Sequence, residues 1–284
     1  MSMLKTSIVP LAISLVFCGD IKAQASLQNA PERSSFGAEL LYSKFGDGSD
    51  FEDISTITGV LAFNTRVAPK VTFFVEVPYT RSSWEFENYN GDMETHTGDA
   101  IGNILVGIEA TGENKNLFFR GGLRLPTSPT DDWARIPGAM SNFSRSFQAF
   151  TPKQFIVDVA GGYRYLAPSG LCAEFKAGPA LWMSTDEEWR LYDEDQSTEI
   201  FLNYKGYLGY DAPKILAGGG IMGMNVMTDE EITDGDRSIF EGYMIAAYKF
   251  ARVQPGIKFI LPLTDELREE VDFTAGITFN VLIG

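Results

Sequence analysis

The side chains with the most obvious chemical potential surround the single histidine of the chain. His96 lies in the stretch ETHTGD, and Asp92, Glu94 and Asp99 are its acidic neighbours in sequence. A histidine beside carboxylates can act as a general base, but a hydrolase also needs a nucleophile or an activated water. No nucleophile motif and no serine–histidine spacing stands out. We therefore expect that the protein is not an enzyme, and a membrane-embedded hydrolase that uses His96 stays open as an alternative.

Other ligand chemistries have weaker support in the sequence. There is no Cys/His metal cluster, phosphate loop or dinucleotide fingerprint, so we expect no cofactor and no metal. A net charge of −15 without a concentrated basic patch argues against nucleic acid as a partner. Clustered carboxylates can bind calcium, yet no acidic stretch has the spacing of a calcium-loop motif, and solubility is the simpler explanation. These stretches are 46–53, 87–99, 184–198, 228–236 and 264–270.

Most of the remaining charges alternate with apolar residues, which is the period of a β-strand. In 154–166, one parity carries Phe155, Val157 and Val159 and continues to Tyr163 and Tyr165, while the other is mostly small, polar or charged. A soluble sandwich would bury the apolar face, whereas a membrane barrel would turn it to lipid and the charges to a lumen. This ribbon alone does not decide between the two.

The N-terminus favours export of the chain. Residues 1–25 have a basic start at Lys5, an apolar run and Ala23-Gln24-Ala25 as a small-x-small cleavage site, which predicts a secretory signal peptide. A lipidated Cys18 is the alternative, although the bulky Phe17 before it fits poorly. If Cys18 leaves with the signal peptide, Cys172 stands alone and no internal disulfide forms.

The mature chain, 26–284, has no apolar run long enough for a membrane helix, so any membrane insertion must use a barrel. We predict about twelve strands with connections that alternate between short and long, as in an up-and-down barrel with tight periplasmic turns and longer outer loops. The fold class is thus all-β, an antiparallel up-and-down transmembrane β-barrel. The predicted strands are 34–45, 54–67, 71–81, 99–111, 117–125, 154–166, 171–182, 199–210, 214–226, 239–250, 257–263 and 271–283.

The charges that alternate to the inner side form a nearly balanced set. They could be an ion-pair lattice that fills a narrow barrel, or a polar lining that selects a solute. A barrel of about twelve strands is intermediate in width, so both interpretations stay open. The predicted lumen-lining residues are Glu76, Glu109, Arg120, Arg124, Asp158, Arg164, Glu174, Lys176, Lys205, Lys258 and Asp272.

The longest connection, 126–153, is unusually aromatic for a loop. It could fold into the lumen mouth as a constriction or ligand contact, or pack against the rim of the barrel. Under the first interpretation it is a candidate gating loop. Its candidate gating residues are Trp133, Arg135, Met140, Phe143, Arg145 and Phe147.

Four short motifs stand in 58–125: Val77-Pro78-Tyr79, Gly98-Asp99, Gly107 and Leu125-Pro126-Thr127. In these positions the chain resembles the outer-membrane proteins named for the phenol meta-degradation pathway. That family has a strand ending in V-P-Y, a G-x-G-D-like start to a strand of the form "ilvGie", and a strand ending in L-P-T-G. Here His96 stands at the first glycine of the G-x-G-D-like motif, and Ser128 replaces the last glycine of L-P-T-G.

The resemblance implies passage of small, often hydrophobic or aromatic compounds through the outer membrane. We accordingly expect a barrel in the outer membrane of a Gram-negative bacterium, with both termini periplasmic, the lipid bilayer around it and a small-molecule solute as its partner. A non-transporting structural or adhesive barrel with a charge-plugged lumen is the alternative. The solute and the oligomeric state are not specified by the sequence.

Overall fold

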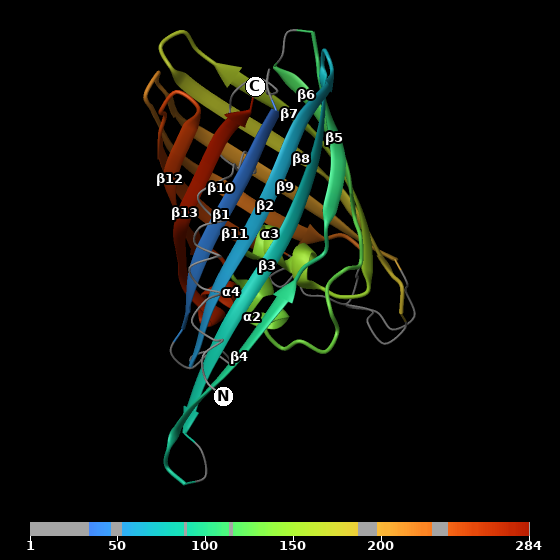
Figure 1. The fold of residues 1–284 in the computed structure, drawn as a ribbon. Helices are drawn as coiled ribbons and strands as arrows, with labels where there is room; N and C mark the ends of the chain where they lie inside the picture. The colour runs from blue at the N-terminus through green and yellow to red at the C-terminus, as the bar shows by residue number, and fades with distance from the viewer. Residues whose placement is uncertain are drawn as a thin grey trace.

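The computed structural model describes residues 34–46, 53–87, 90–113, 116–186, 198–228 and 238–283. The predicted signal peptide lies outside these residues, as do most of the acidic residues of 46–53, 184–198 and 228–236. The described chain is one antiparallel sheet that closes on itself (Figure 1). Its strands are β1 (Ser34–Phe45), β2 (Ile54–Ala68), β3 (Val71–Glu87), β4 (Met93–Ile101), β5 (Leu105–Thr111), β6 (Leu117–Arg124), β7 (Gln154–Leu166), β8 (Leu171–Ser184), β9 (Thr198–Asp211), β10 (Ile215–Val226), β11 (Ser238–Tyr248), β12 (Val253–Pro262) and β13 (Val271–Ile283).

Closure of the barrel depends on two pairings. β1 pairs with β13, and β2 pairs with β3 over its whole length. β4 and β5 both pair with β3, one after the other, so together they occupy a single place in the barrel wall. The thirteen strands therefore make a barrel of twelve places, which confirms the predicted fold class and strand number.

The alternation of side chains is confirmed in the opposed strands β7 and β8. Val159 and Tyr163 are 48% and 44% exposed, whereas Ile156 and Cys172, at positions of the other parity, are fully buried. Successive side chains in a strand point to opposite faces, so the exposed parity is the outer face of the barrel.

The outer face is apolar around the barrel. A soluble protein rarely exposes apolar surface on this scale, while a barrel in a membrane turns it to the acyl chains. The wall therefore spans a membrane. Large exposed apolar residues on it include Ile57, Leu61, Ile108, Phe119, Leu123, Phe175, Leu208, Ile221, Met244, Ile257 and Ile277.

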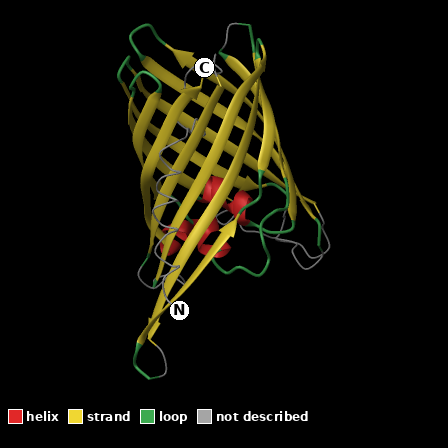
Figure 2. Cartoon of the chain, viewed as in Figure 1, coloured by secondary structure: helices red, strands yellow, loops and turns green. Residues whose placement is uncertain are grey.

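The two ends of the barrel differ as the alternating connections predict. The tight turns lie at the end that also holds the C-terminus, and the longer connections lie at the opposite end (Figure 1). In the part of the chain that the structure describes, those longer connections hold the short helices α2 (Arg135–Met140), α3 (Phe143–Phe150) and α4 (Asp265–Glu270), which gather toward that end (Figure 2). Among the described residues, no helix is both long and apolar enough to cross a membrane.

The connection predicted at 82–98 is mostly strand. β3 continues to Glu87 and β4 begins at Met93, so the two form a hairpin that projects beyond the barrel rim (Figure 1). The signal was present in the alternating Trp84 and Phe86, whose rings are 4.9 Å apart. Glu85 between them and Glu87 after them obscured this signal, because acidic residues are depleted in strands.

Candidate functional site

The segment 125–153 crosses the barrel interior, and α2 lies against one wall. Ser141, directly after α2, has its hydroxyl 2.6 Å from that of Thr58 on β2. Its carbonyl accepts a 2.6 Å hydrogen bond from the Thr274 hydroxyl on β13. Gly138 touches β3 so closely that an added Cβ would be 2.6 Å from Thr80 Oγ1. All three wall residues are buried and face inward, so α2 is inside the barrel.

The start of α3 is bound to a different strand. The backbone N–H groups of Phe143 and Ser144 each donate to the Glu241 carboxylate on β11, both at 2.9 Å, and the Ser144 hydroxyl donates to it as well. The first N–H groups of a helix have no partner within the helix, and they carry partial positive charge. A buried carboxylate from the wall therefore satisfies them and fixes the position of α3.

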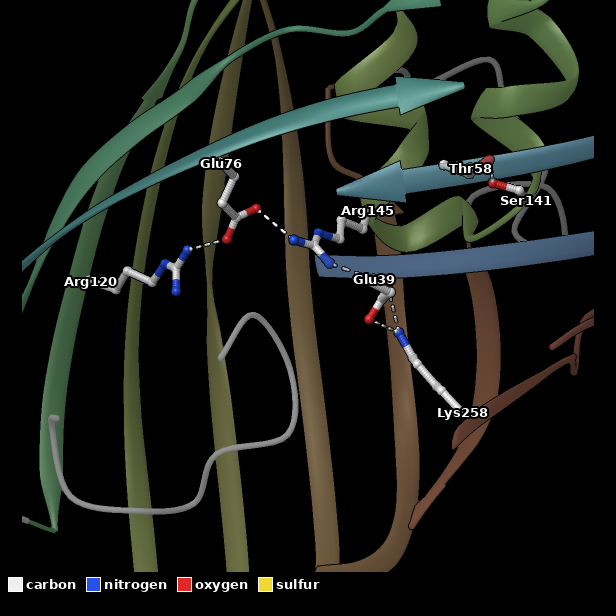
Figure 3. Close-up of polar contacts among 7 residues, drawn as sticks. All are labelled: Glu39, Thr58, Glu76, Arg120, Ser141, Arg145 and Lys258. Atoms are coloured by element: carbon white, nitrogen blue, oxygen red, sulfur yellow. Dashed lines mark hydrogen bonds and ion pairs between the residues drawn. The ribbon is translucent and has the colours of Figure 1, made fainter. Parts of the chain in front are cut away.

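Arg145 on α3 connects the segment to β1 and β3, the strands on either side of β2 (Figure 3). Its guanidinium donates to Glu76 on β3 at 2.9 Å and to Glu39 on β1 at 3.4 Å. Glu76 also accepts from Arg120 at 3.0 Å, and Glu39 pairs with Lys258 at 3.3 Å. One continuous chain of ion pairs thus runs from β6 to β12 through the helix, and Arg145 is its central link.

Aromatic packing supports the other face of α3. Phe143 and Phe147 stack with ring centroids 4.6 Å apart, and Phe147 contacts Trp182 on β8 at 5.4 Å. Trp182 in turn packs on Phe201 of β9 at 4.5 Å. These rings belong to a buried apolar cluster that also includes Ile156, the one apolar exception to the alternation of β7. Ile156 is therefore explained by the helix that it underlies.

The C-terminal end of the segment is held by Asn103, in the break between β4 and β5. Its amide donates to the carbonyls of Thr151, at 2.6 Å, and Gln148, at 3.2 Å, while its oxygen accepts from the Ser128 N–H at 2.9 Å. The wall is interrupted where the crossing segment is attached. Nothing in the sequence distinguished Asn103 from an ordinary loop residue.

A second group of charges lies nearer the tight turns. Arg164 on β7 donates to Glu109 at 2.7 Å and to Glu174 at 2.7 Å, and its guanidinium lies 3.9 Å from the centre of the Phe118 ring. All three charged side chains are at least 87% shielded from solvent. Charges this shielded are stable only when paired, and these are paired with each other.

Ten of the eleven residues predicted to line the lumen have buried or half-buried side chains at inward positions. Glu76, Glu109, Arg124, Lys205 and Lys258 are buried, and Arg120, Asp158, Arg164, Glu174 and Lys176 are only partly exposed.

The eleventh, Asp272, was placed wrongly. The pairing of β1 and β13 shifts between Lys44 and Phe45, so that Phe45 pairs with Val271 and Asp272 becomes an extra, bulged residue. Its carboxylate is 39% exposed and accepts a 2.7 Å hydrogen bond from the exposed Lys44. A bulge reverses the alternation locally, which a strict count of every second residue misses.

Glu39 and Glu241, the two wall carboxylates that hold the crossing segment, were not predicted. Glu39 stands between Gly37 and Leu41 on the inner side of β1, where alternation alone could have identified it. Glu241 is harder to find, because β11 has apolar residues on both faces.

The six candidate gating residues are all in the crossing segment. Arg145, Phe143 and Phe147 make the contacts given above, and Met140 packs against the same aromatic cluster. Trp133 precedes α2 and stacks on His96 at 5.6 Å, and Arg135 begins α2. The histidine that could have served a hydrolase thus has an indole against its ring. In the described ranges, no group of three His, Cys, Asp or Glu residues could hold a metal.

Comparison with known proteins gives fold relatives only. No family model matches the chain, and no curated protein matches it. An outer-membrane channel from Pseudomonas putida F1 has 12% identity and a TM-score of 0.60, covering 93% of this chain and 99% of that one. The translocator domain of the autotransporter NalP from Neisseria meningitidis has 8% identity and a TM-score of 0.52, covering 97% and 95%. By fold, the chain is an outer-membrane β-barrel.

Proposed function

We propose that the protein is an outer-membrane channel for small solutes, and that the crossing segment 125–153 gates it. In this proposal the tight turns face the periplasm of a Gram-negative bacterium and the longer connections face outward, the usual orientation of bacterial barrels. The likeness to an outer-membrane channel supports the fold on which the proposal rests. The resemblance of 58–125 to the phenol-pathway family supports the same class of function.

The observation that carries the proposal is the way in which α2 and α3 are held. No strand pairing joins these helices to the wall. Apart from the backbone hydrogen bond that the Asn103 N–H donates to the Ala149 carbonyl of α3, the polar contacts of these helices to the wall involve side chains, such as those of Ser141, Glu241 and Arg145. The segment can therefore move without breaking the sheet, as a gate must.

The lining of the interior favours a solute with an apolar body and a polar group. Charged side chains dominate β3 and β5 to β8, and their charges are nearly balanced. The opposite side, mainly β9 to β12, also carries Lys205, Glu241 and Lys258, but it adds an apolar and aromatic surface. Tyr207, Met222, Tyr243 and Ile260 lie there in one buried cluster. A few placed polar groups beside an apolar surface are typical of small-molecule sites.

One observation favours the alternative of a closed, non-transporting barrel. The chain of ion pairs through Arg145 runs along the inner face of the wall from β6 to β12 and fixes the segment to it, as in a permanent plug. A gated channel and a closed barrel differ in whether these ion pairs ever break. Conductance distinguishes them directly.

The test compares the native protein with a deletion of 133–147 in planar bilayers. If the segment gates the channel, the deletion raises single-channel conductance several-fold, and small aromatic solutes reduce the current in a concentration-dependent way. The control is Lys44→Met, which removes an exposed ion pair at the rim and leaves the lumen unchanged. Equal conductance of the native protein and the 133–147 deletion variant would refute the gating proposal, provided that a heat-modifiable gel shift shows both to be folded.

A further inference from the structure

An apolar groove lies in the outer wall of the barrel, away from the lumen. It has a volume of about 370 Å³ and crosses β3, β5, β6 and β7. Outward-facing apolar side chains form the sides of the groove. The inward-facing residues Gly107, Gly122 and Asp158 line it at the strand positions between those side chains. The lining residues are Phe73, Val106, Gly107, Ile108, Gly121, Gly122, Leu123, Val157, Asp158 and Val159.

Gly121 creates the groove. It occupies an outward position of β6 between Phe119 and Leu123, which are 67% and 40% exposed. A Cβ added at Gly121 would have no atom within 4 Å, so this position opens directly into the space beside Ile108 and Val159. The wall is therefore indented at this outward position, which carries no side chain between its apolar neighbours.

We propose that this groove binds one acyl chain of a phospholipid. The groove is continuous with the surface that contacts the bilayer, and a chain lying in it touches protein on several sides instead of one. Dispersion attraction increases with the number of neighbouring atoms, so an acyl chain in the groove stays bound longer than an acyl chain on the flat part of the wall. The lining side chains on the outer face offer no hydrogen-bonding group, which excludes a headgroup as the occupant.

The position of the groove selects a phospholipid over a lipopolysaccharide. Gly121 lies four residues from the start of β6 at the tight-turn end, which is about 13 Å along the strand and less in height because barrel strands tilt. In the orientation proposed above, this depth belongs to the periplasmic leaflet. That leaflet of an outer membrane consists of phospholipid.

The experiment is native mass spectrometry of the full chain, extracted from outer membranes and washed in detergent. The native protein should retain one phospholipid, and Gly121→Leu should reduce the retained fraction at least tenfold by filling the groove. Gly206→Leu is the matched control, since Gly206 also faces outward, three strands away on β9, and the nearest atom to an added Cβ there is Ile221 Cγ1 at 3.9 Å. It should retain the lipid as the native protein does. Val159→Phe narrows the groove from β7 and serves if Gly121→Leu does not fold.

Three results would overturn the proposal. One is equal retention by the native, Gly121→Leu and Val159→Phe proteins. Another is retention of lipopolysaccharide by mass in place of phospholipid. The third is a native dimer without lipid that becomes monomeric in Gly121→Leu, which would make the groove a contact between copies. Channel conductance should be the same in Gly121→Leu and in the native protein, so this test is independent of the proposed function.

Discussion

Replacing Arg145 with methionine should release the crossing segment while the barrel stays intact. Arg145 is 10% exposed and links α3 to Glu76 at 2.9 Å and to Glu39 at 3.4 Å. Methionine keeps much of the side-chain length and removes the charge. Neither carboxylate is left unpaired, because Glu76 retains Arg120 and Glu39 retains Lys258. The closed state therefore loses less stability than it would if a buried charge were left with no partner.

The expected magnitude follows from these contacts. The 2.9 Å contact between Arg145 and Glu76 is a charge-assisted hydrogen bond, and a bond of this kind contributes roughly 1.5–3 kcal/mol. The 3.4 Å contact between Arg145 and Glu39 is long for a hydrogen bond and adds little. A loss of about 2 kcal/mol from the closed state corresponds to a roughly 30-fold rise in the open-to-closed ratio. Removing a buried pair that leaves one charge alone would instead cost about 3–5 kcal/mol.

The assay is the open probability of single channels in planar bilayers. Arg120→Met is the matched control, because it removes the other partner of Glu76 without touching the crossing segment. We expect a rise in open probability for Arg145→Met and none for Arg120→Met. The reasoning fails if Arg145→Met leaves the open probability unchanged in a folded barrel, or if both variants raise it equally.

Two further predictions concern stability. Trp182→Ala should lower the free energy of unfolding by about 3–5 kcal/mol in urea titrations in lipid vesicles, because it empties the cluster under α3. Trp84→Ala, 43% exposed on the hairpin, should change it by less than about 0.5 kcal/mol, and equal losses would contradict the role given to the cluster. Gly178→Ala should greatly lower the refolding yield, since its Cβ would overlap the Val159 carbonyl oxygen, whereas Gly121→Ala has open space and should refold normally.

The barrel itself could be predicted because its main signal is local. Alternation with a period of two appears in any strand that has an apolar face and a polar face, and nine of the twelve predicted strands match observed strands to within two residues at each end. Of the other three, 71–81 ends six residues too early, 257–263 begins four residues too late, and 99–111 is divided into β4 and β5. The prediction failed where local signals conflict. Acidic residues hid the extension of β3 to Glu87, and a bulge reversed the side of Asp272.

The candidate site was only partly predictable, because its members meet across long distances in sequence. Glu241 accepts a hydrogen bond from the N–H of Phe143, which is 98 residues away in sequence, and Glu39 is 106 residues from its partner Arg145. Composition marked 126–153 as an unusual loop but gave it no partners. Asn103, which fixes its end, had no signal at all.

The sequence by itself determined that the chain forms a barrel with an apolar outer face and a charged interior. Both signals are local: successive side chains of a strand alternate between the two faces, and each charge that faces lipid costs free energy. Tertiary structure alone decided which charges pair, where α2 and α3 cross the lumen, and that Gly121 leaves a groove in the wall. Those features depend on closure of the sheet, which brings strands from the two ends of the chain together and sets the register between them.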